Sequence, residues 1–366
     1  MTPNQAEYIW HDGSKPTQQL RSKSRIVTSF ENRPLSIGDF PTWSFDGSST
    51  YQASGNDSDL ILKPVRFVSD PLRGAGNFLV LCEVFNADGT PHTTNTRARL
   101  RQVLESGVDQ EEPWIGFEQE YALLKGRLPL GFPDEGYPAP QGPYYCGIGA
   151  GNVFGRHIVE AHTKACLHAG LMIYGTNAEV LPGQWEFQIG YRGIPGEAAD
   201  PLTISDHLWF ARWLLYRIAE DFGVVPTLAA KPVKGDWNGS GMHTNFSTKG
   251  MRDGQTGLDA IELAIKSLEA RHDEHIASYG HGLEERLTGL HETCAIDQFR
   301  SGVADRGTSI RIPAHVASQG YGYLEDRRPA ANADPYTVAA RILETVCSNG
   351  KPTRRVRAQR AELALT

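Results

Sequence analysis

Residues 116–121 constrain the fold of this chain more than any other segment. They read GFEQEY, with Glu118 and Glu120 two positions apart. Side chains two positions apart in a strand share a face, so both carboxylates lie on one face while Phe117 and Tyr121 lie on the other. Such a pair alone is more often a solvated strand face than a site, because charged residues usually stay exposed.

Two further acidic segments favour a site. Residues 177–180 read NAEV and residues 184–189 read QWEFQI, so apolar and aromatic neighbours frame Glu179 and Glu186. A buried carboxylate without a partner costs several kcal/mol, and clustered glutamates in a core therefore usually bind metal ions or cationic side chains. The three segments predict a group of carboxylates that requires cations.

The composition is that of an ordinary globular protein, since 40% of the 366 residues are hydrophobic and 22% are charged. The net charge of −7 argues against nucleic acid as a partner and leaves anionic substrates in need of local arginines or metal ions. The chain begins without a charged and then apolar segment, and it has no run approaching 18 apolar residues. We therefore expect a cytoplasmic protein without a membrane partner.

The five cysteines indicate neither a disulfide framework nor a structural zinc site. Their number is odd and they form no Cys-x-x-Cys pair, being Cys82, Cys146, Cys166, Cys294 and Cys347. We expect buried or idle thiols.

The order of elements predicts two domains. Residues 1–92 contain short strands separated by turns, predicted at 6–10, 24–28, 59–63 and 77–84. Residues 93–366 add helical patterns between the acidic strands, predicted at 96–105, 157–169, 205–222 and 258–279. A small β-rich domain followed by a larger α+β domain is expected. The basic residues 351–357 are typical of a solvated tail, and no function is assigned to them.

Several common sites are excluded by their motifs. There is no phosphate-binding Gly-x-x-x-x-Gly-Lys-Ser/Thr segment, and residues 147–152 place Asn152 where the third glycine of a dinucleotide fingerprint belongs. Residues 291–295 begin like a zinc protease helix but carry Ala295 in place of the second histidine. No nucleophile elbow of a serine hydrolase is present.

Hard oxygen ligands, one histidine on a predicted strand and late arginines remain. His243 follows glycines that permit close approach of the backbone to a ligand, although a lone histidine is more often structural. Arg306, Arg311 and Arg327 offer planar donors for phosphate or carboxylate, and Glu325 could join a metal site. These residues alone indicate only phosphoryl transfer with a divalent metal, and a guanidino kinase stays an alternative.

The chain resembles the shorter, eukaryotic-like (type II) glutamine synthetases from residues 7–10 to residues 332–335. The resemblance lies in residues 45–50, 116–121, 140–147, 175–180, 184–189, 236–247, 286–293 and 325–329. It implies an α+β fold, with a small N-terminal β-grasp-like domain at residues 1–92 and a larger C-terminal α/β catalytic domain at residues 93–366. The catalytic domain would carry the curved antiparallel sheet of glutamine synthetases and guanidino kinases.

The resemblance implies ATP-dependent ligation of ammonia to the γ-carboxyl of L-glutamate through γ-glutamyl phosphate. The products would be L-glutamine, ADP and phosphate, a reaction of nitrogen assimilation. Magnesium or manganese would occupy two or more sites per active site, in keeping with oxygen-rich ligands. One metal site would comprise Glu120, Glu179 and Glu186, and another Glu118, His243 and Glu325.

The family pattern also implies roles for other residues. Ammonium would be bound by Asp46, Ser49, Tyr145 and Glu179, and the catalytic residues would be Asp46, Glu292 and Arg306. Glutamate would be bound by Asn238, Gly239, Arg286, Arg306 and Arg327. ATP would be bound by Trp114, Glu118, Glu186, Asn245, Phe246, Ser247, Arg306, Arg311 and Tyr323. Glu292 would lie on a flap that shields the acyl phosphate from water.

In this family Asp46 acts in an active site shared with a neighbouring subunit, so we expect a homo-oligomer, with a decamer of two five-membered rings implied by the resemblance. The sequence departs from the family pattern in a longer segment at 191–203, a shorter one at 280–283, and Met242 in place of a frequent cysteine. Two alternatives remain, a ligase for polyamines or other amines and an inactive structural relative. The retained ammonium residues and metal ligands argue against them.

Overall fold

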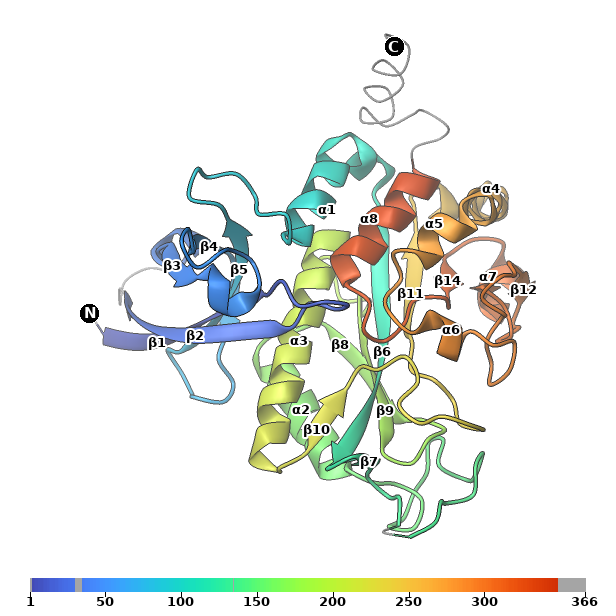
Figure 1. Ribbon diagram of the computed structural model, residues 1–366. Coiled ribbons are helices and arrows are strands. Elements are labelled where there is room, and N and C mark those ends of the chain that lie inside the picture. The colour runs from blue at the N-terminus through green and yellow to red at the C-terminus, as the bar shows by residue number, and fades with distance from the viewer. Residues whose placement is uncertain (1, 30–34, 134, 348–366) are drawn as a thin grey trace.

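The computed structural model describes residues 2–29, 35–133 and 135–347 (Figure 1). The basic residues 351–357 lie outside this part of the chain. The N-terminal unit is a five-stranded sheet in the order β2-β1-β5-β4-β3, in which β1 and β5 are parallel. Its elements are β1 (Thr2–His11), β2 (Leu20–Ser29), η1 (Ile37–Asp39), β3 (Trp43–Asp46), η2 (Gly47–Thr50), β4 (Asp59–Ser69) and β5 (Phe78–Phe85).

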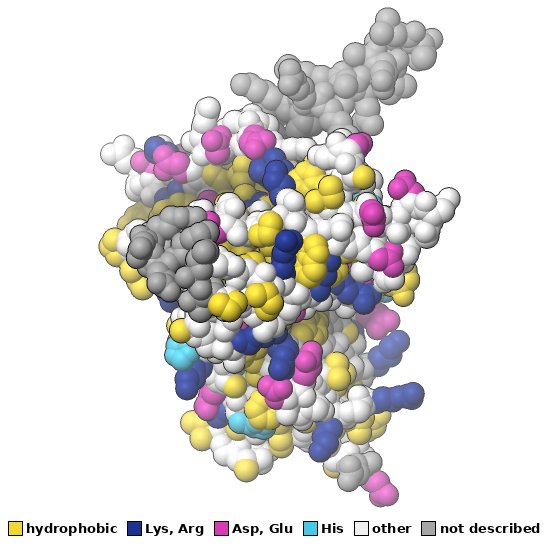
Figure 2. Space-filling model, turned by 90° about the vertical axis from the view of Figure 1, so that its left-hand side faces the viewer, with side chains coloured by type: hydrophobic (Ala, Val, Ile, Leu, Met, Phe, Trp, Pro, Cys, Tyr) yellow, Lys and Arg dark blue, Asp and Glu magenta, His cyan; other side chains and the backbone are white. Residues whose placement is uncertain are grey.

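The N-terminal sheet has a core of its own. Tyr8, Trp10, Phe45, Leu62 and Val80 belong to one buried cluster, and alternation along β1 places Tyr8 and Trp10 on the same face. The predicted small β-rich domain is confirmed. Figure 2 views the molecule from this side, where basic, acidic and hydrophobic side chains are interspersed.

The second sheet has nine strands, and seven of them follow the order β12-β13-β14-β11-β6-β9-β8. All its pairings are antiparallel except that of β12 with β13. The strands are β6 (Trp114–Lys125), β7 (Leu128–Pro129), β8 (Ile173–Ala178), β9 (Gln184–Ile189), β10 (Val225–Thr227), β11 (Met242–Ser247), β12 (Ser301–Val303), β13 (Ile310–Ile312) and β14 (Leu324–Asp326). The long strand β6 lies in the middle and pairs with β7, β9, β10 and β11.

Helix α3 packs against strands β6, β9 and β10 of this sheet (Figure 1). The helices are α1 (Thr96–Glu105), η3 (Val108–Glu111), α2 (Arg156–His168), α3 (Pro201–Asp221), η4 (Gly250–Arg252), α4 (Gly257–Ala270), α5 (His272–Ile276), α6 (Leu283–Arg286), α7 (Ala314–Gln319) and α8 (Pro335–Val346). Among the described residues, no helix combines the length and the apolar character needed to cross a membrane. Helices and mixed sheets together confirm the α+β class.

Most predicted helices are found, with two corrections. Helix α3 begins at Pro201, earlier than predicted, because the Asp200 side chain caps it by accepting from Thr203 N and proline suits the first helical position. The prediction of one helix over 258–279 is wrong. Arg271 leaves helical geometry (φ −123°, ψ 24°) between α4 and α5, and His272 then reaches the carbonyl oxygen of Ile296 at 2.8 Å.

The cysteines match the sequence expectation. All five are free thiols. Cys82, Cys166 and Cys294 are buried, and Cys146 is exposed.

Asp206 of α3 links the N-terminal sheet to the helices of the second unit through a buried charge network. Its carboxylate accepts from Arg66 of β4 at 2.7 Å and from Arg97 of α1 at 2.8 Å. The hydroxyl of Tyr336 donates to it at 2.6 Å, and Arg97 also pairs with Glu83 of β5 at 2.8 Å. Asp206 is fully buried, so its charge depends on these partners.

Replacing Asp206 with alanine should lower the free energy of unfolding by about 3–5 kcal/mol, because Arg97 then keeps a buried charge without its main partner. The measurement is urea unfolding at neutral pH. Asp221→Ala on the same helix is the control, since Asp221 makes an exposed pair with Arg217 and its loss should change stability by about 0.5 kcal/mol or less. Equal effects of the two changes would contradict the assignment.

Candidate active site

A cavity of about 660 Å³ lies over the face of the large sheet that carries the glutamates. It is lined by residues of strands β6, β8, β9, β11 and β13 and of loops between the elements. Its lining residues are Glu118, Glu120, Gln141, Gly142, Tyr145, Tyr174, Asn177, Glu179, Val180, Gln184, Glu186, Gln188, Asn238, Gly239, His243, Asn245, Arg286, His291, Glu292, Thr293, Arg306, Arg311, Tyr323 and Arg327. The volume is in the range of small-molecule sites.

Strand register brings the acidic residues together. Glu120 of β6 lies directly opposite Glu186 of β9, and Glu118 lies opposite His243 of β11. Glu325 of β14 lies opposite Asn245 of β11. Asn245 is two positions after His243 and therefore shares its face of the sheet. Because side chains opposite each other in a sheet are close neighbours, residues far apart in sequence converge at one place.

One possible metal-ligand group consists of Glu118, His243 and Glu325, whose candidate ligand atoms lie within 4.8 Å of one another. The Nδ1 atom of His243 is 3.5 Å from Glu118 Oε2 and 3.5 Å from Glu325 Oε1. Glu325 also accepts from Arg311 at 2.7 Å and from Arg327 at 2.6 Å. The structure brings together all members of this predicted set.

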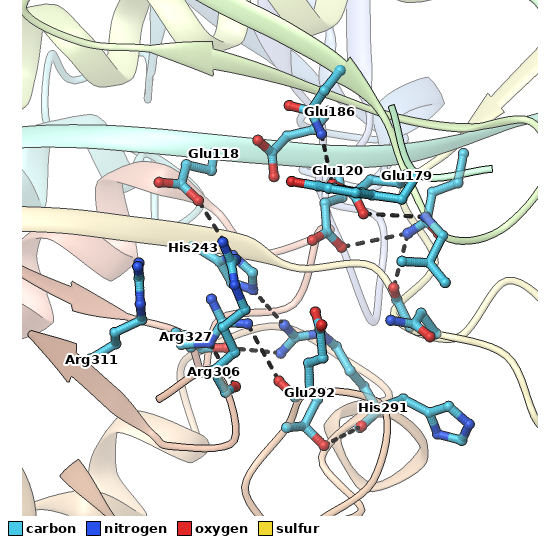
Figure 3. Close-up of a pocket in the computed structure, with 18 of the residues that line it drawn as sticks. Glu118, Glu120, Glu179, Glu186, His243, His291, Glu292, Arg306, Arg311 and Arg327 are labelled. Atoms are coloured by element: carbon cyan, nitrogen blue, oxygen red, sulfur yellow. Dashed lines mark hydrogen bonds and ion pairs between the residues drawn. The ribbon is translucent and has the colours of Figure 1, made fainter. Parts of the chain in front are cut away.

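A second group consists of Glu120, Glu186 and His243, again with ligand atoms within 4.8 Å. Glu179, predicted as the third member, follows the end of β8 instead of lying within it and lines the same cavity. Figure 3 shows Glu120, Glu179 and Glu186 turned toward a common space.

Glu120, Glu179 and Glu186 are buried close together, so their carboxylates repel one another when they are ionised. Burial raises the pKa of Glu120 to about 7. Burial, with the charge of Glu120 next in importance, raises the pKa of Glu179 to about 8. Burial and the neighbouring carboxylates Glu118, Glu120 and Glu179 also raise the pKa of Glu186. Buried like charges of this kind are relieved by a bound cation.

The donor set fits magnesium or manganese. These ions prefer oxygen ligands, and carboxylates predominate here with one imidazole. Thiolate ligands, which would favour zinc, are absent from both groups. The raised pKa values of Glu120, Glu179 and Glu186 fit the same conclusion, because a bound cation would stabilise the ionised form of these crowded carboxylates.

Arginines face the carboxylates across the cavity (Figure 3). Arg327 is buried and donates through Nε to the carbonyl oxygen of Arg306 at 3.1 Å. Arg286 is buried beside His243, with 3.0 Å between Nη2 and Nε2. Arg311 borders the same space. The cavity can therefore hold cations on one wall and anionic groups on the other.

The predicted glutamate pocket is formed by a loop before β11. Asn238 and Gly239 line the cavity, and Asn238 Oδ1 accepts from Gln141 Nε2 at 2.8 Å. A side chain at position 239 would place its Cβ 2.6 Å from the Ala230 carbonyl oxygen and 2.7 Å from Arg286 Cγ. Only glycine fits that position.

Some predicted residues do not line this cavity. Asp46 ends strand β3 of the N-terminal sheet and Ser49 lies in η2, where Asp46 accepts from Ser48 and Ser49. Hydrogen bonds from Ser48 and then Ser49 lower the pKa of Asp46 to about 2. Glu325, Trp114, Phe246 and Ser247 also lie outside the lining. Trp114 packs against Tyr191, with ring centroids 5.0 Å apart, and under Arg252 at 4.0 Å.

Sequence reasoning missed several lining residues. Gln184 and Gln188 flank Glu186 on β9, and their alternation with it was a usable signal. Tyr174 of β8 and Gln141 of a loop carried no comparable signal. Gln184 donates to the Gly239 carbonyl oxygen at 2.9 Å, so it supports the backbone of the loop at residues 238 and 239.

The comparisons with known proteins agree with this geometry. Residues 3–87 match the family model "Glutamine synthetase, beta-Grasp domain", and residues 93–259 match "Glutamine synthetase, catalytic domain". A protein of Chlamydomonas reinhardtii named "Glutamine synthetase, chloroplastic" is 56% identical over 93% of this chain and 90% of its own length. "Glutamine synthetase" of Streptomyces viridochromogenes is 55% identical, covering 94% and 96%. "Glutamine synthetase" of Neurospora crassa is 55% identical, covering 93% and 91%.

Raising the pH from about 7.5 to about 9 should lower the free energy of unfolding of the metal-free protein. Glu179 titrates at about 8 when folded against 4.5 for the free side chain. A carboxyl group with a raised folded pKa gives stability that is complete below its unfolded pKa and is lost as the pH rises through its folded pKa. Buried histidines such as His11, whose pKa is lowered from 6.5 to about 4, have nearly finished titrating below this window in both the folded and the unfolded state. Urea unfolding in a chelator at both pH values measures the effect.

Glu179→Gln should lose part of this pH dependence, and the exposed Asp221→Asn should retain it. Stability that rises over the window, or an unchanged slope in Glu179→Gln, would contradict the assigned shift.

Proposed function

Because the chain belongs to the glutamine synthetase family, we propose that this cavity joins ammonia to the γ-carboxyl group of L-glutamate. ATP is consumed, and the products are L-glutamine, ADP and phosphate. The observation that carries the proposal is that five of the six predicted metal ligands line one cavity together with arginines, and that the sixth, Glu325, lies 3.5 Å from Nδ1 of His243. The family as a whole depends on ATP and a divalent metal.

We propose two metal positions, one at Glu118, His243 and Glu325 and one at Glu120, Glu179 and Glu186. The first set is supported by its close ligand atoms, and the second by the closeness of Glu120 to Glu186 and by the place of Glu179 in the same cavity. Bound magnesium or manganese supplies charge neutralisation at the ATP phosphates and at the glutamate carboxylate. In the protein itself, Arg311 and Arg327 hold Glu325 in place. This restraint keeps the ligand side chain oriented before the substrates arrive.

Glutamate is held at its α-amino and α-carboxyl ends by Asn238, Gly239 and Arg286. Its γ-carboxylate oxygen attacks the γ-phosphorus of ATP, ADP leaves, and γ-glutamyl phosphate forms. Arg306 and Arg327 stabilise the charge on the transferring group, because positioned cations are most effective where water is excluded. The nucleotide lies toward Arg311, Asn245, Phe246, Ser247, Tyr323 and Trp114.

Ammonium binds among Asp46, Ser49, Tyr145 and Glu179, and Asp46 accepts its proton before ammonia attacks the acyl carbon. Tyr145 and Glu179 line the cavity, whereas Asp46 and Ser49 lie outside it in the same chain. This separation supports an active site completed by a neighbouring subunit of a homo-oligomer. We propose a decamer of two five-membered rings.

The separate roles of the two units support the predicted domain boundary between residues 92 and 93. The N-terminal unit supplies the ammonium residues to the neighbour, and the catalytic unit supplies the metal, glutamate and ATP sites. We also propose a cytoplasmic location, although one relative is named chloroplastic.

The proposal is tested by phosphate release from ATP with magnesium and glutamate, with and without ammonium. Release that requires ammonium and equals the glutamine formed supports it. Release only with a polyamine or another amine would assign the alternative ligase activity, and no release with any amine would favour an inactive relative.

Asp46→Ala should spare ATP and metal binding while lowering ammonia-dependent turnover by about 100-fold or more, because it removes only the proton acceptor. Turnover at saturating glutamate and direct titration of ATP with magnesium measure the two parts. Asp88→Ala is the control, since Asp88 is an exposed turn residue of the same unit that bonds Thr90. Unchanged turnover in Asp46→Ala would exclude the role.

Mixing Asp46→Ala subunits with Glu186→Gln subunits should restore activity. In a head-to-tail ring, each active site takes Asp46 from one chain and Glu186 from its neighbour. Random mixing of the two variants then leaves both residues native in about one quarter of the sites. The two variants are unfolded together, refolded and assayed beside each variant refolded alone. No gain over the separate variants, despite mixed assembly, would contradict shared active sites.

A further inference from the structure

Asp236 and His291 connect two loops at the rim of the cavity. Nε2 of His291 lies 2.7 Å from Oδ1 of Asp236. Asp236 precedes the glutamate-pocket residues Asn238 and Gly239, and His291 immediately precedes Glu292. The contact therefore joins the loop that would hold glutamate to the loop that would shield the intermediate.

The backbone at His291 and Glu292 is unusual. Their φ angles are 52° and 61°, so two consecutive residues other than glycine adopt the left-handed region. Side chains disfavour this region, and such conformations persist only when surrounding contacts fix them. Two contacts do so here, the one between His291 and Asp236 and the bond from Arg327 Nη2 to the Glu292 carbonyl oxygen at 3.3 Å.

This backbone turns the two side chains in different directions. Figure 3 shows Glu292 extending into the space between the carboxylates and the arginines, while the His291 ring points away from them. The side chain of His291 is mostly buried, whereas that of Asp236 is 73% exposed. Asp236 can thus form or release the contact without opening the core.

We propose that Asp236 and His291 are positioning residues that hold Glu292 over the acyl phosphate and keep water from it. The inference rests on the proposed function, because it assigns the contact a role in that reaction. The glutamate-pocket loop is itself anchored, since Asn238 accepts from Gln141 at 2.8 Å. Glutamate binding at Asn238 and placement of Glu292 are coupled through Asp236.

The reaction that the contact suppresses is hydrolysis of γ-glutamyl phosphate. Water oxygen attacks the acyl carbon, the bond from that carbon to the phosphate oxygen breaks, and phosphate leaves. The water releases a proton to solvent and glutamate is regenerated. Each such event consumes one ATP without forming glutamine, so the ratio of phosphate to glutamine reports it.

The experiment measures this ratio in the full-length enzyme with magnesium, ATP, glutamate and limiting ammonium. Asp236→Ala and His291→Asn are compared with the wild type, and asparagine is chosen because it tolerates the left-handed backbone at position 291. The ratio should rise about threefold in each variant, in keeping with the modest strength of a partly exposed hydrogen bond. Lys234→Ala, in the same loop and 85% exposed, is the control.

The double variant should show no larger ratio than either single variant, because both changes remove the same contact. A ratio of one in both single variants would overturn the inference. So would lower turnover at an unchanged ratio, which indicates a structural role alone. A wild type that forms no glutamine would instead refute the proposed function, so the two failures are distinguishable.

Discussion

The pairing of β6 with β9 and β11 is the constraint on which the site depends. It places Glu120 opposite Glu186 and Glu118 opposite His243. A shift of one residue in either pairing would turn these side chains to the opposite face and destroy both ligand groups. The cost is mutual repulsion among buried carboxylates, which is visible in the raised pKa values of Glu120 and Glu179.

The opposite face of β6 supplies the restraint that holds this register. Gln119, between the two glutamates, is fully buried and accepts from Arg212 Nε of α3 at 2.8 Å. Arg212 also donates to the carbonyl oxygens of Ala331 and Ala333, each at 3.0 Å. Burial lowers the pKa of Arg212 to about 10, so this arginine stays charged at neutral pH. Alternation along β6 thus places Glu118 and Glu120 on one face and Gln119, which anchors the strand to Arg212, on the other.

Much of this arrangement was predictable from sequence, for reasons of periodicity. Alternation predicted that Glu118 and Glu120 share a face, and the helix at 96–105 was predicted with the bounds of α1. The family resemblance, and not the pattern, grouped Glu325 with His243. The break at Arg271 and the side chain of Tyr174 in the cavity were not predicted, because tertiary contacts determine both. Local patterns carry no information on such contacts.

The left-handed backbone at Glu292 shows most clearly what local sequence patterns do not predict. Its sequence context, a histidine and a glutamate, gives no reason to expect positive φ angles at both positions. The conformation depends on Asp236 and Arg327, which lie far away in the chain. The candidate metal ligands are instead placed mainly by strand pairing. In the proposed function, the site thus combines cation ligands on paired strands with a shielding loop that distant contacts hold in place.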